Sequence, residues 1–406
     1  MRFPAAYYQM LQTVDEHFSS CLLPSQRRGL VLWVYGTVLA RSACQTMVTA
    51  ALMPVCQRGV HTVRQYLREW LYDGGDKAAP CGTDITITAC FVPLMRWVLS
   101  LWQGEQLVLA IDVTNLHDRL HALSVCVLYR GCAIPVAWHL RQGGEKGAWT
   151  PEFVRLFDHL APAIPARLQV LVLMDAGLRS PTLWEAVCGH GWHVLQRHEA
   201  ALNFRPAGWH AFHRADQFVL IPGRAWVGTG TAFKQASSRR TATLIVVWEE
   251  DTPGPWVLLT DLAPSVVGVT WYGLRMWVEL GFRALKGMGW HWEWTRRIDA
   301  ARAEQHWLVL AVATCWVLAC GTRVEDATAA ACLPARLHRP LSTRTPVRTQ
   351  PRRRTLSLFL LGTSALLDQC IRGRLWRQLW LAPEPWPPTS PGLVVWRDAG
   401  PPGITA

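Results

Sequence analysis

The sequence predicts an α/β protein in which the core is interrupted by a β-rich insertion and preceded by a helical amino-terminal domain. The continuous apolar run Leu107–Ile111 and the largely apolar run Leu168–Met174 are typical of buried central strands. Helical and β-like segments alternate after Gln106, whereas the first hundred residues have helical periodicity. Between His198 and Leu262, short β-like runs separated by turn residues replace this alternation.

The composition is that of a basic, globular chain. Of the 406 residues half are hydrophobic and 17% are charged, which excludes a disordered protein. The net charge is +12 and most basic residues are arginines, whose guanidinium groups bind phosphate in bidentate fashion. A nucleic acid is therefore the expected partner, although a GC-rich genome would produce the same arginine bias.

The sequence favours a cytoplasmic, nucleoid-associated protein without a membrane partner. Residues Met1–Met10 lack the apolar region of a signal peptide. The apolar runs Gly29–Ala40 and Trp307–Gly321 are shorter than the roughly 18 to 20 residues of a membrane span. The twelve cysteines form no Cys-x-x-Cys pair, so we expect reduced thiols and no zinc site.

The first hundred residues are expected to fold as helices. One helix follows Gln26-Arg27-Arg28 and runs through Leu39, and a second covers His61–Leu71 and closes at Asp73-Gly74-Gly75. Basic side chains recur on one side of the second segment. They indicate either a solvated helix face or a domain that binds DNA ends. These side chains are Arg58, Arg64 and Arg68.

After Gln106 the predicted order is three antiparallel strands, a helix, a strand, a helix and a further strand. That order is typical of a ribonuclease-H-like fold. The second and third strands form a hairpin around Tyr129–Cys132. The predicted elements are the strands Leu107–Ile111, Ala122–Leu128, Ala133–Leu140, Leu168–Met174 and Trp192–Gln196, with helices Pro151–Leu160 and Pro181–Cys188.

We predict five segments: a helical domain over 1–100, the core over 101–197 and 263–322, the β-rich insertion over 198–262, and a tail over 323–406. The β-like runs of the insertion are Phe218–Ile221, Ala225–Thr229, Ala242–Trp248 and Trp256–Leu259. Two helices follow, Trp271–Gly287 and His306–Cys320. The tail holds an arginine-rich stretch, Ala335–Arg354, and a proline-rich stretch, Pro383–Pro402, which is expected to be loose.

Two aspartates each follow one of the buried apolar runs. Asp112 comes after Leu107–Ile111, and Asp175 comes after Leu168–Met174. Side chains at the carboxyl ends of strands line the crevice in which α/β proteins bind ligands. Two carboxylates held close together repel each other, and hard divalent cations such as Mg²⁺ or Mn²⁺ remove that cost. A helix N-cap is the alternative interpretation of each aspartate.

A third carboxylate, Glu279, lies within the helix predicted over Trp271–Gly287. It belongs to the spacing Tyr-x2-Arg-x3-Glu-x6-Lys formed by Tyr272, Arg275, Glu279 and Lys286. At about 100° per residue, these four side chains fall on one stripe about 60° wide. A polar stripe of this length suits a polyanion lying along the helix.

Arg283 lies beside the polar stripe and gives the main alternative, an i,i+4 salt bridge with Glu279. The opposite face of the same helix is apolar and is expected to pack on the core. Its residues are Leu274, Val278, Gly281 and Leu285.

The spacing of Tyr272, Arg275, Glu279 and Lys286 resembles the Y-R-E-K signature of the fourth insertion-sequence family of DDE transposases. The resemblance covers about 106–321 and includes the two aspartates, in order, and the run Trp256–Leu262 that leads out of a β insertion. The sequence departs from the family in Ala176-Gly177-Leu178, where an aromatic residue often follows the second aspartate.

This resemblance implies a DNA transposase that cleaves transposon ends and transfers the freed strand into target DNA. Its partners are double-stranded DNA, both terminal inverted repeats and target, and a second copy of the chain in a synaptic homodimer. The implied catalytic and metal-binding residues, for two Mg²⁺ ions with Mn²⁺ as a substitute, are Asp112, Asp175 and Glu279. The implied DNA contacts are Tyr272, Arg275, Arg283 and Lys286.

In relatives a tryptophan of the β insertion stacks on a flipped base, and the alternative for each tryptophan here is ordinary packing on the sheet. The candidates are Trp209, Trp226, Trp248 and Trp256. Three other functions remain open from the sequence. They are a catalytically inactive or domesticated transposase that only binds DNA, a repair nuclease of the same fold, and a membrane protein suggested by the positive mean hydropathy.

Overall fold

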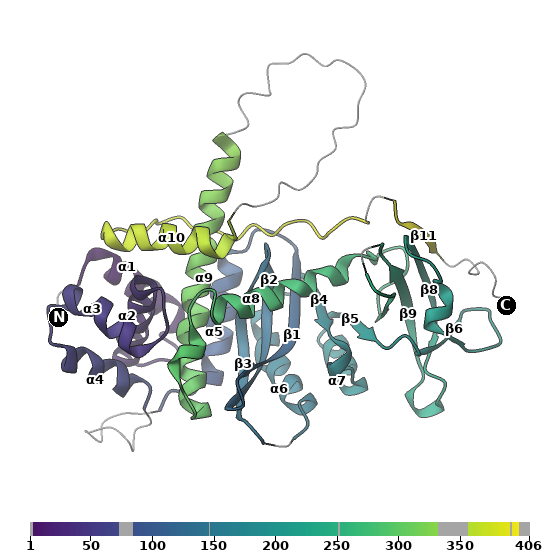
Figure 1. The fold of residues 1–406 in the computed structure, drawn as a ribbon, viewed down its shortest axis with the longest axis horizontal. Helices are drawn as coiled ribbons and strands as arrows, with labels where there is room; N and C mark the ends of the chain where they lie inside the picture. The colour runs from purple at the N-terminus through teal and green to yellow at the C-terminus, as the bar shows by residue number, and fades with distance from the viewer. Residues whose placement is uncertain are drawn as a thin grey trace, which may run out of the picture. The chain divides into compact units, whose positions relative to one another are not determined.

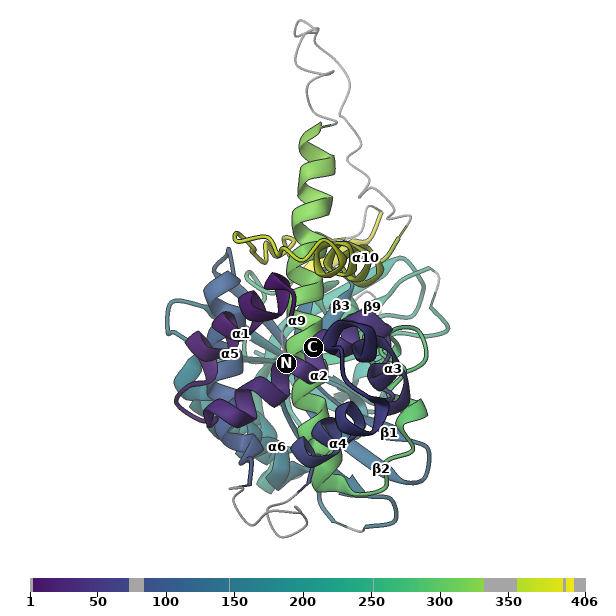
Figure 2. The same cartoon turned by 90° about the vertical axis from the view of Figure 1, so that its left-hand side faces the viewer.

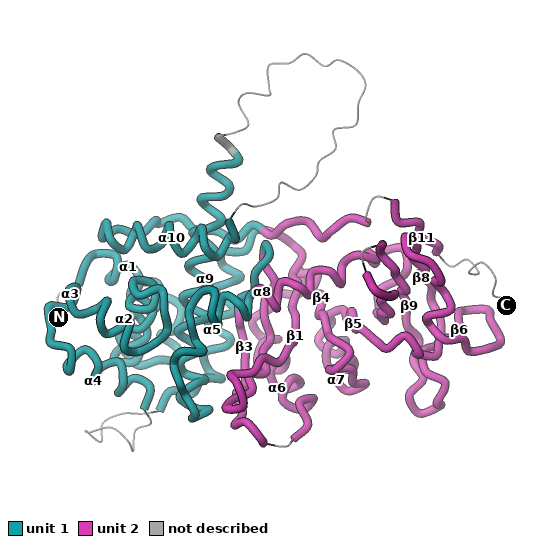
Figure 3. The backbone as a smooth tube through the Cα atoms, viewed as in Figure 1, with its two compact units in different colours: residues 1–103, 130–134, 281–382 teal, residues 104–129, 135–280, 383–406 magenta. Residues whose placement is uncertain are grey.

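A computed structural model describes residues 3–72, 84–145, 147–250, 252–331, 356–389 and 392–397. The chain forms two compact units, and each is built from three separate stretches of sequence (Figure 3). Unit 1 comprises Met1–Gln103, Arg130–Ile134 and Gly281–Ala382. Unit 2 comprises Gly104–Tyr129, Pro135–Leu280 and Pro383–Ala406.

Unit 1 is helical, as predicted for the first hundred residues. The helix α9 packs on α2, α5 and α10, and Figure 2 shows it running lengthwise among them. The helices α1, α3, α5 and α10 had no counterpart among the predicted elements. The helices are α1 (Ala5–Phe18), α2 (Pro24–Ala40), α3 (Gln45–Cys56), α4 (Val60–Trp70), α5 (Phe91–Leu101), α9 (Ala300–Ala331) and α10 (Leu358–Ile371).

The helix α9 is longer than the predicted His306–Cys320. Judged by length and composition alone, it is the one described helix that could cross a membrane, and α2 with α3 would be a second candidate if taken as one span bent by 95°. However, 89% of the apolar window of α9 is buried inside the protein. Burial of this extent is what the central helix of a globular core requires.

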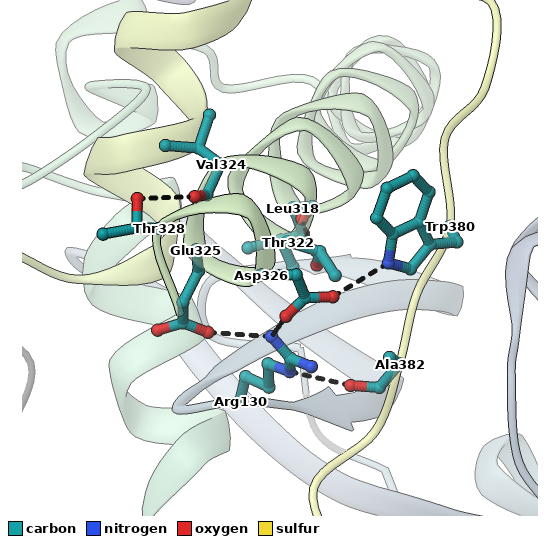
Figure 4. Close-up of polar contacts among 9 residues, drawn as sticks. All are labelled: Arg130, Leu318, Thr322, Val324, Glu325, Asp326, Thr328, Trp380 and Ala382. Carbon is teal, nitrogen blue, oxygen red and sulfur yellow. Dashed lines mark hydrogen bonds and ion pairs between the residues drawn. The ribbon is translucent and has the colours of Figure 1, made fainter. Parts of the chain in front are cut away.

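The turn of a β-hairpin is fixed to α9 by a buried arginine. Arg130 and Gly131 both have positive φ, 43° and 80°, as a two-residue type I′ turn requires. The Nη1 of Arg130 lies 2.8 Å from Glu325 and 2.9 Å from Asp326, both on α9. Figure 4 shows that its Nε donates to the carbonyl of Ala382, at 2.7 Å.

Unit 2 is organised around one large mixed sheet (Figure 1). Its strand order is β3-β2-β1-β4-β5-β10-β9-β8-β6-β7. β1 pairs antiparallel with β2 and parallel with β4, which in turn pairs parallel with β5. The first five strands are β1 (Gln106–Leu116), β2 (Leu120–Tyr129), β3 (Cys132–Gln142), β4 (Gln169–Met174) and β5 (His193–His198).

The residues predicted as a β-rich insertion, 198–262, extend this same sheet, because β10 pairs antiparallel with β5 and with β9. The predicted strand at Phe218–Ile221 is wrong: Ala215–Phe218 is a 3₁₀ helix, and Leu220 and Ile221 are exposed. The strands of the insertion are β6 (Asn203–Pro206), β7 (His213–Arg214), β8 (Arg224–Ala232), β9 (Arg240–Trp248) and β10 (Trp256–Thr260).

Helical segments complete the core of unit 2. The predicted helices before and after β4 are present as α6 (Thr150–Leu160) and α7 (Pro181–Gly189). The segment predicted as one helix over Trp271–Gly287 has two parts, the 3₁₀ helix η7 (Trp271–Arg275) and the α-helix α8 (Met276–Leu285). β4 contacts η7, which brings the start of this segment to the sheet.

The proline-rich tail is not loose where the structure describes it. The strand β11 (Val394–Arg397) pairs in parallel with β8. The hydroxyl of Thr270 donates to the carbonyls of Pro387 and Pro388, at 3.1 and 3.0 Å. These contacts lie far apart in sequence, which is why composition alone did not predict them. The arginine-rich stretch and the helix end at 73–75 lie outside the described residues.

We predict that Arg130 stabilises unit 1 through its buried ion pairs. Arg130→Met should lower the thermal midpoint by about 3 to 6 °C, because it leaves two partly buried carboxylates without their cation. Arg372→Met is the matched control, since its pair with Asp368 is 76% exposed on the arginine side and should matter little. Equal shifts in the two variants, measured by differential scanning calorimetry, would contradict this role.

Candidate active site

The parallel pairing of β1 with β4 places two aspartates side by side. The last parallel pair is Ala110 with Leu173. Because side chains alternate along a strand, the next residues on the same face are Asp112 and Asp175. Asp112 was predicted to follow the end of its strand, but it lies inside β1, opposite Ser124 of β2. Asp175 directly follows β4, as predicted.

One guanidinium group brings three carboxylates together. The Nη2 of Arg275 lies 2.9 Å from Oδ2 of Asp112 and 3.7 Å from Oδ2 of Asp175. Its Nη1 lies 3.2 Å from Oε1 of Glu279, which is in the first turn of α8. The structure therefore brings the three predicted catalytic carboxylates to one place, all within unit 2.

Arg275 is not the exposed charge that the helical wheel predicts. Its side chain is 11% exposed, and Tyr272 is 4% exposed. The wheel assumed an α-helix throughout, but Trp271–Arg275 is a 3₁₀ helix with about three residues per turn, so the angular positions differ. The apolar face is buried as predicted, including Leu274 and Val278.

Tyr272 supports the second aspartate. Its hydroxyl donates to Oδ1 of Asp175 at 3.3 Å, and its ring packs edge-on against Trp256, with centroids 5.5 Å apart. Burial raises the pKa of Tyr272, and the nearby charge of Asp175 raises it further, so the phenol stays protonated and remains a hydrogen-bond donor.

Burial and charge act against each other on the central ion pairs. Burial raises the pKa of Asp112 from 3.8 to about 6, although the Arg275 guanidinium and the Val113 N–H both favour the ionised form. Glu279 and Asp175 raise the pKa of Asp112 further by charge repulsion. Burial alone would lower the pKa of Arg275, but Asp112, Tyr272 and Asp175 raise it overall. The single arginine therefore does not fully offset the cost of burying Asp112.

The alternative interpretations from the sequence are not supported by the contacts. Asp175 occupies the N-cap position of the short 3₁₀ helix Ala176–Leu178, but its side chain makes no capping hydrogen bond. The i,i+4 ion pair of Glu279 is with Arg275, which precedes it, and not with Arg283. Arg283 is exposed in the last turn of α8, and Lys286 follows that helix; both belong to unit 1.

The site has the donor set of a divalent-cation site. Carboxylate oxygens are the ligands that Mg²⁺ and Mn²⁺ prefer, and the three of them lie within reach of one central group. Among the described residues, no three His, Cys, Asp or Glu side chains already form an open metal site. The Arg275 guanidinium forms ion pairs with these carboxylates. The three carboxylates are thus suitable ligands for such an ion, provided that the Arg275 side chain moves away from them.

The tryptophans considered for base stacking have different surroundings in the structure. Trp226 is 1% exposed and packs against Phe204 and Phe218, so it is a core residue. The indole N–H of Trp248 donates to the carbonyl of Thr252. Trp256 contacts a site residue, because its ring packs against Tyr272. The sequence alone gave no reason to prefer Trp256 to the other three tryptophans as the residue nearest the site.

Part of the chain is similar in sequence to a known protein family. Residues 121–316 match the family model of the transposase DDE domain. The segment is similar to the DDE transposases. It spans slightly less than half of the chain and contains Asp175 and Glu279, whereas Asp112 lies just before it. No curated protein matches the chain.

Among solved structures, the chain is similar to the piggyBac transposase in a synaptic complex with hairpin DNA, determined by cryo-electron microscopy. The two chains are 10% identical, and the match covers 90% of this chain and 78% of that chain with a TM-score of 0.39. A likeness this slight adds no support for a shared mechanism.

We predict that Asp112 makes the metal-free protein less stable as the pH rises. Its folded pKa of about 6 exceeds its ordinary value of 3.8, so folding takes up a proton between these values. The stabilisation is fully present below pH 3.8 and is lost as the pH rises through about 6, which lowers the free energy of unfolding by about 2 to 3 kcal/mol. Asp112→Asn should remove this decline, measured by urea unfolding in EDTA, whereas Asp118→Asn, at an exposed turn, should keep it. A decline that persists in Asp112→Asn would refute the assignment.

Proposed function

We propose that this protein is a DNA transposase that cleaves transposon ends and joins them to target DNA in a metal-dependent reaction. The observation that carries the proposal is the convergence of Asp112, Asp175 and Glu279 on one guanidinium group. The family match over 121–316 supports a transposase independently of that geometry.

The sheet supports a ribonuclease-H-like core. Three strands in the order β3-β2-β1 are followed by the parallel strands β4 and β5, with α6 and α7 in the connections. In this proposal the residues of 198–262 form the insertion, and those of 1–100 form the helical domain that binds DNA ends. The exposed Arg58, Arg64 and Arg68 suit such a domain.

In the proposed reaction the three carboxylates hold two Mg²⁺ ions, with Mn²⁺ as a substitute. When bound, the ions supply Lewis-acid activation and offset negative charge during in-line phosphoryl transfer. The parallel pairing of β1 with β4 places Asp112 and Asp175 next to each other on one face of the sheet. The Tyr272 hydroxyl orients Asp175 through a hydrogen bond. Arg283 and Lys286 are proposed contacts to DNA phosphates, in a synaptic homodimer. Tyr272 and Arg275, which the sequence also assigned to DNA, contact the carboxylates in this structure.

We predict that Glu279→Gln separates DNA binding from cleavage. The substitution preserves the shape of the side chain but removes a proposed metal ligand, so cleavage in Mg²⁺ should fall at least about a hundredfold. Affinity for the same DNA should stay within about twofold of wild type, because Glu279 contributes no positive charge to phosphate binding.

The assay uses end-labelled duplexes taken from the DNA on either side of the gene, with cleavage followed on sequencing gels. Glu185→Gln is the control, because Glu185 is an exposed carboxylate on α7 in the same unit. If Glu279→Gln cuts at the wild-type rate, Glu279 is not catalytic. If wild type binds these duplexes but does not cut them in Mg²⁺ or Mn²⁺, the protein is a DNA-binding derivative instead.

A further inference from the structure

The charges at the centre of the site are unequal. One guanidinium group faces three carboxylates, with contacts of 2.9 Å to Asp112, 3.7 Å to Asp175 and 3.2 Å to Glu279. When all four groups are ionised, a net negative charge remains around Arg275. The Arg275 and Asp112 side chains are only 11% and 13% exposed, so water screens the charges of this pair poorly, whereas Asp175 and Glu279 are 40% and 44% exposed.

Arg275 is also incompletely bonded. Its Nε is buried and has no hydrogen-bond partner among the described residues. A guanidinium group with a full set of acceptors uses its whole fork of donors. Charge, and not a complete set of hydrogen bonds, therefore holds Arg275 in place. A group held in this way can be replaced by another cation that satisfies the same carboxylates better.

A divalent cation and the Arg275 guanidinium cannot occupy this position together. Mg²⁺ lies about 2.0 to 2.1 Å from its oxygen ligands. The Nη2 of Arg275 lies 2.9 Å from Oδ2 of Asp112 and 3.7 Å from Oδ2 of Asp175, the two carboxylates that would hold the ion. Two cations in contact repel each other strongly in a poorly screened site.

We infer that Arg275 is the resident counter-ion of the metal-free site and must leave the three carboxylates before a divalent cation can bind. Arg275 is thus a positioning residue: it keeps the carboxylates together during folding and competes with the ion afterwards. This inference rests on the proposed function for the identity of the site, but its consequences concern ion binding alone and can be measured without DNA.

The first test is Mn²⁺ binding to the full-length protein, measured by isothermal titration calorimetry and by electron paramagnetic resonance. Removing a competing cation that forms ion pairs with all three carboxylates should tighten binding in Arg275→Gln by about tenfold or more. Unchanged or weaker binding would overturn the inference, because a residue that only supports the fold cannot improve affinity by being lost.

A control separates displacement from simple charge removal. Arg197 on β5 acts on Tyr272 through its charge but forms no ion pair with the three carboxylates. Arg197→Gln should therefore leave the Mn²⁺ affinity within about twofold of wild type. If Arg197→Gln tightens binding as much as Arg275→Gln does, general electrostatics explains the effect and displacement is refuted.

Thermal melting supplies the second test. In EDTA, Arg275→Gln should melt below wild type, because three carboxylates lose their counter-ion. Saturating Mn²⁺ should then raise its midpoint more than that of wild type, in line with tighter binding. Arg141→Gln removes an equally buried arginine, paired with Glu152 at 2.8 Å, and its deficit should persist in Mn²⁺. Equal rescue of both variants contradicts the inference.

Wild-type protein provides a test that does not depend on the variant folding. The Nε–H signal of Arg275 in a nitrogen-15 spectrum should shift when Mg²⁺ is added, while that of Arg141 should not. An unchanged chemical shift of the Arg275 Nε–H at saturating Mg²⁺ would contradict the inference that the ion displaces Arg275. Failure of this inference leaves the proposed function intact if wild type binds Mn²⁺ and cuts DNA. If wild type binds no Mn²⁺, both fail together.

Discussion

The ion pairs between Arg275 and three carboxylates are the interaction on which the site depends. Asp112, Asp175 and Glu279 come from a strand, a strand end and a helix that are far apart in sequence. Bringing three negative charges into a partly buried place is unfavourable unless a cation accompanies them. Arg275 supplies that cation from within the chain, so the site can assemble during folding before any ion is bound.

The sheet supplies the second constraint. Parallel pairing of β1 with β4 fixes the register in which Asp112 and Asp175 become neighbours, and a slip by one residue would turn one aspartate to the opposite face. The same sheet continues through β5 into the insertion, where Trp256 starts β10 and meets Tyr272. The insertion therefore contributes to the surroundings of the site through its pairing with the core.

Local sequence patterns were sufficient for the five strands β1 to β5, but they missed β6, β7 and β11 and placed a strand wrongly at Phe218–Ile221. Apolar runs marked β1 and β4, and the Arg130–Gly131 turn lies where the hairpin was predicted. Patterns failed where the geometry depends on distant contacts or on helix type. The 3₁₀ turn over Trp271–Arg275 changed Arg275 from an expected surface charge into a buried partner.

The tail was misjudged for a related reason. Proline-rich composition describes a segment that forms few local hydrogen bonds, but it says nothing of partners elsewhere in the chain. In the structure the tail packs Trp386 against Trp271, with ring centroids 4.4 Å apart, and adds β11 beside β8. The i,i+4 spacing of Arg275 and Glu279 was visible in the sequence, and it was the one available signal for the central ion pair.

The most direct test of the carboxylate site is a crystal structure of the protein soaked in Mn²⁺, with anomalous diffraction locating the ions. We expect anomalous density bonded to Asp112, Asp175 and Glu279, with the Arg275 guanidinium displaced from its position between them. Anomalous density confined to other residues, with Arg275 still paired to all three carboxylates, would contradict the account.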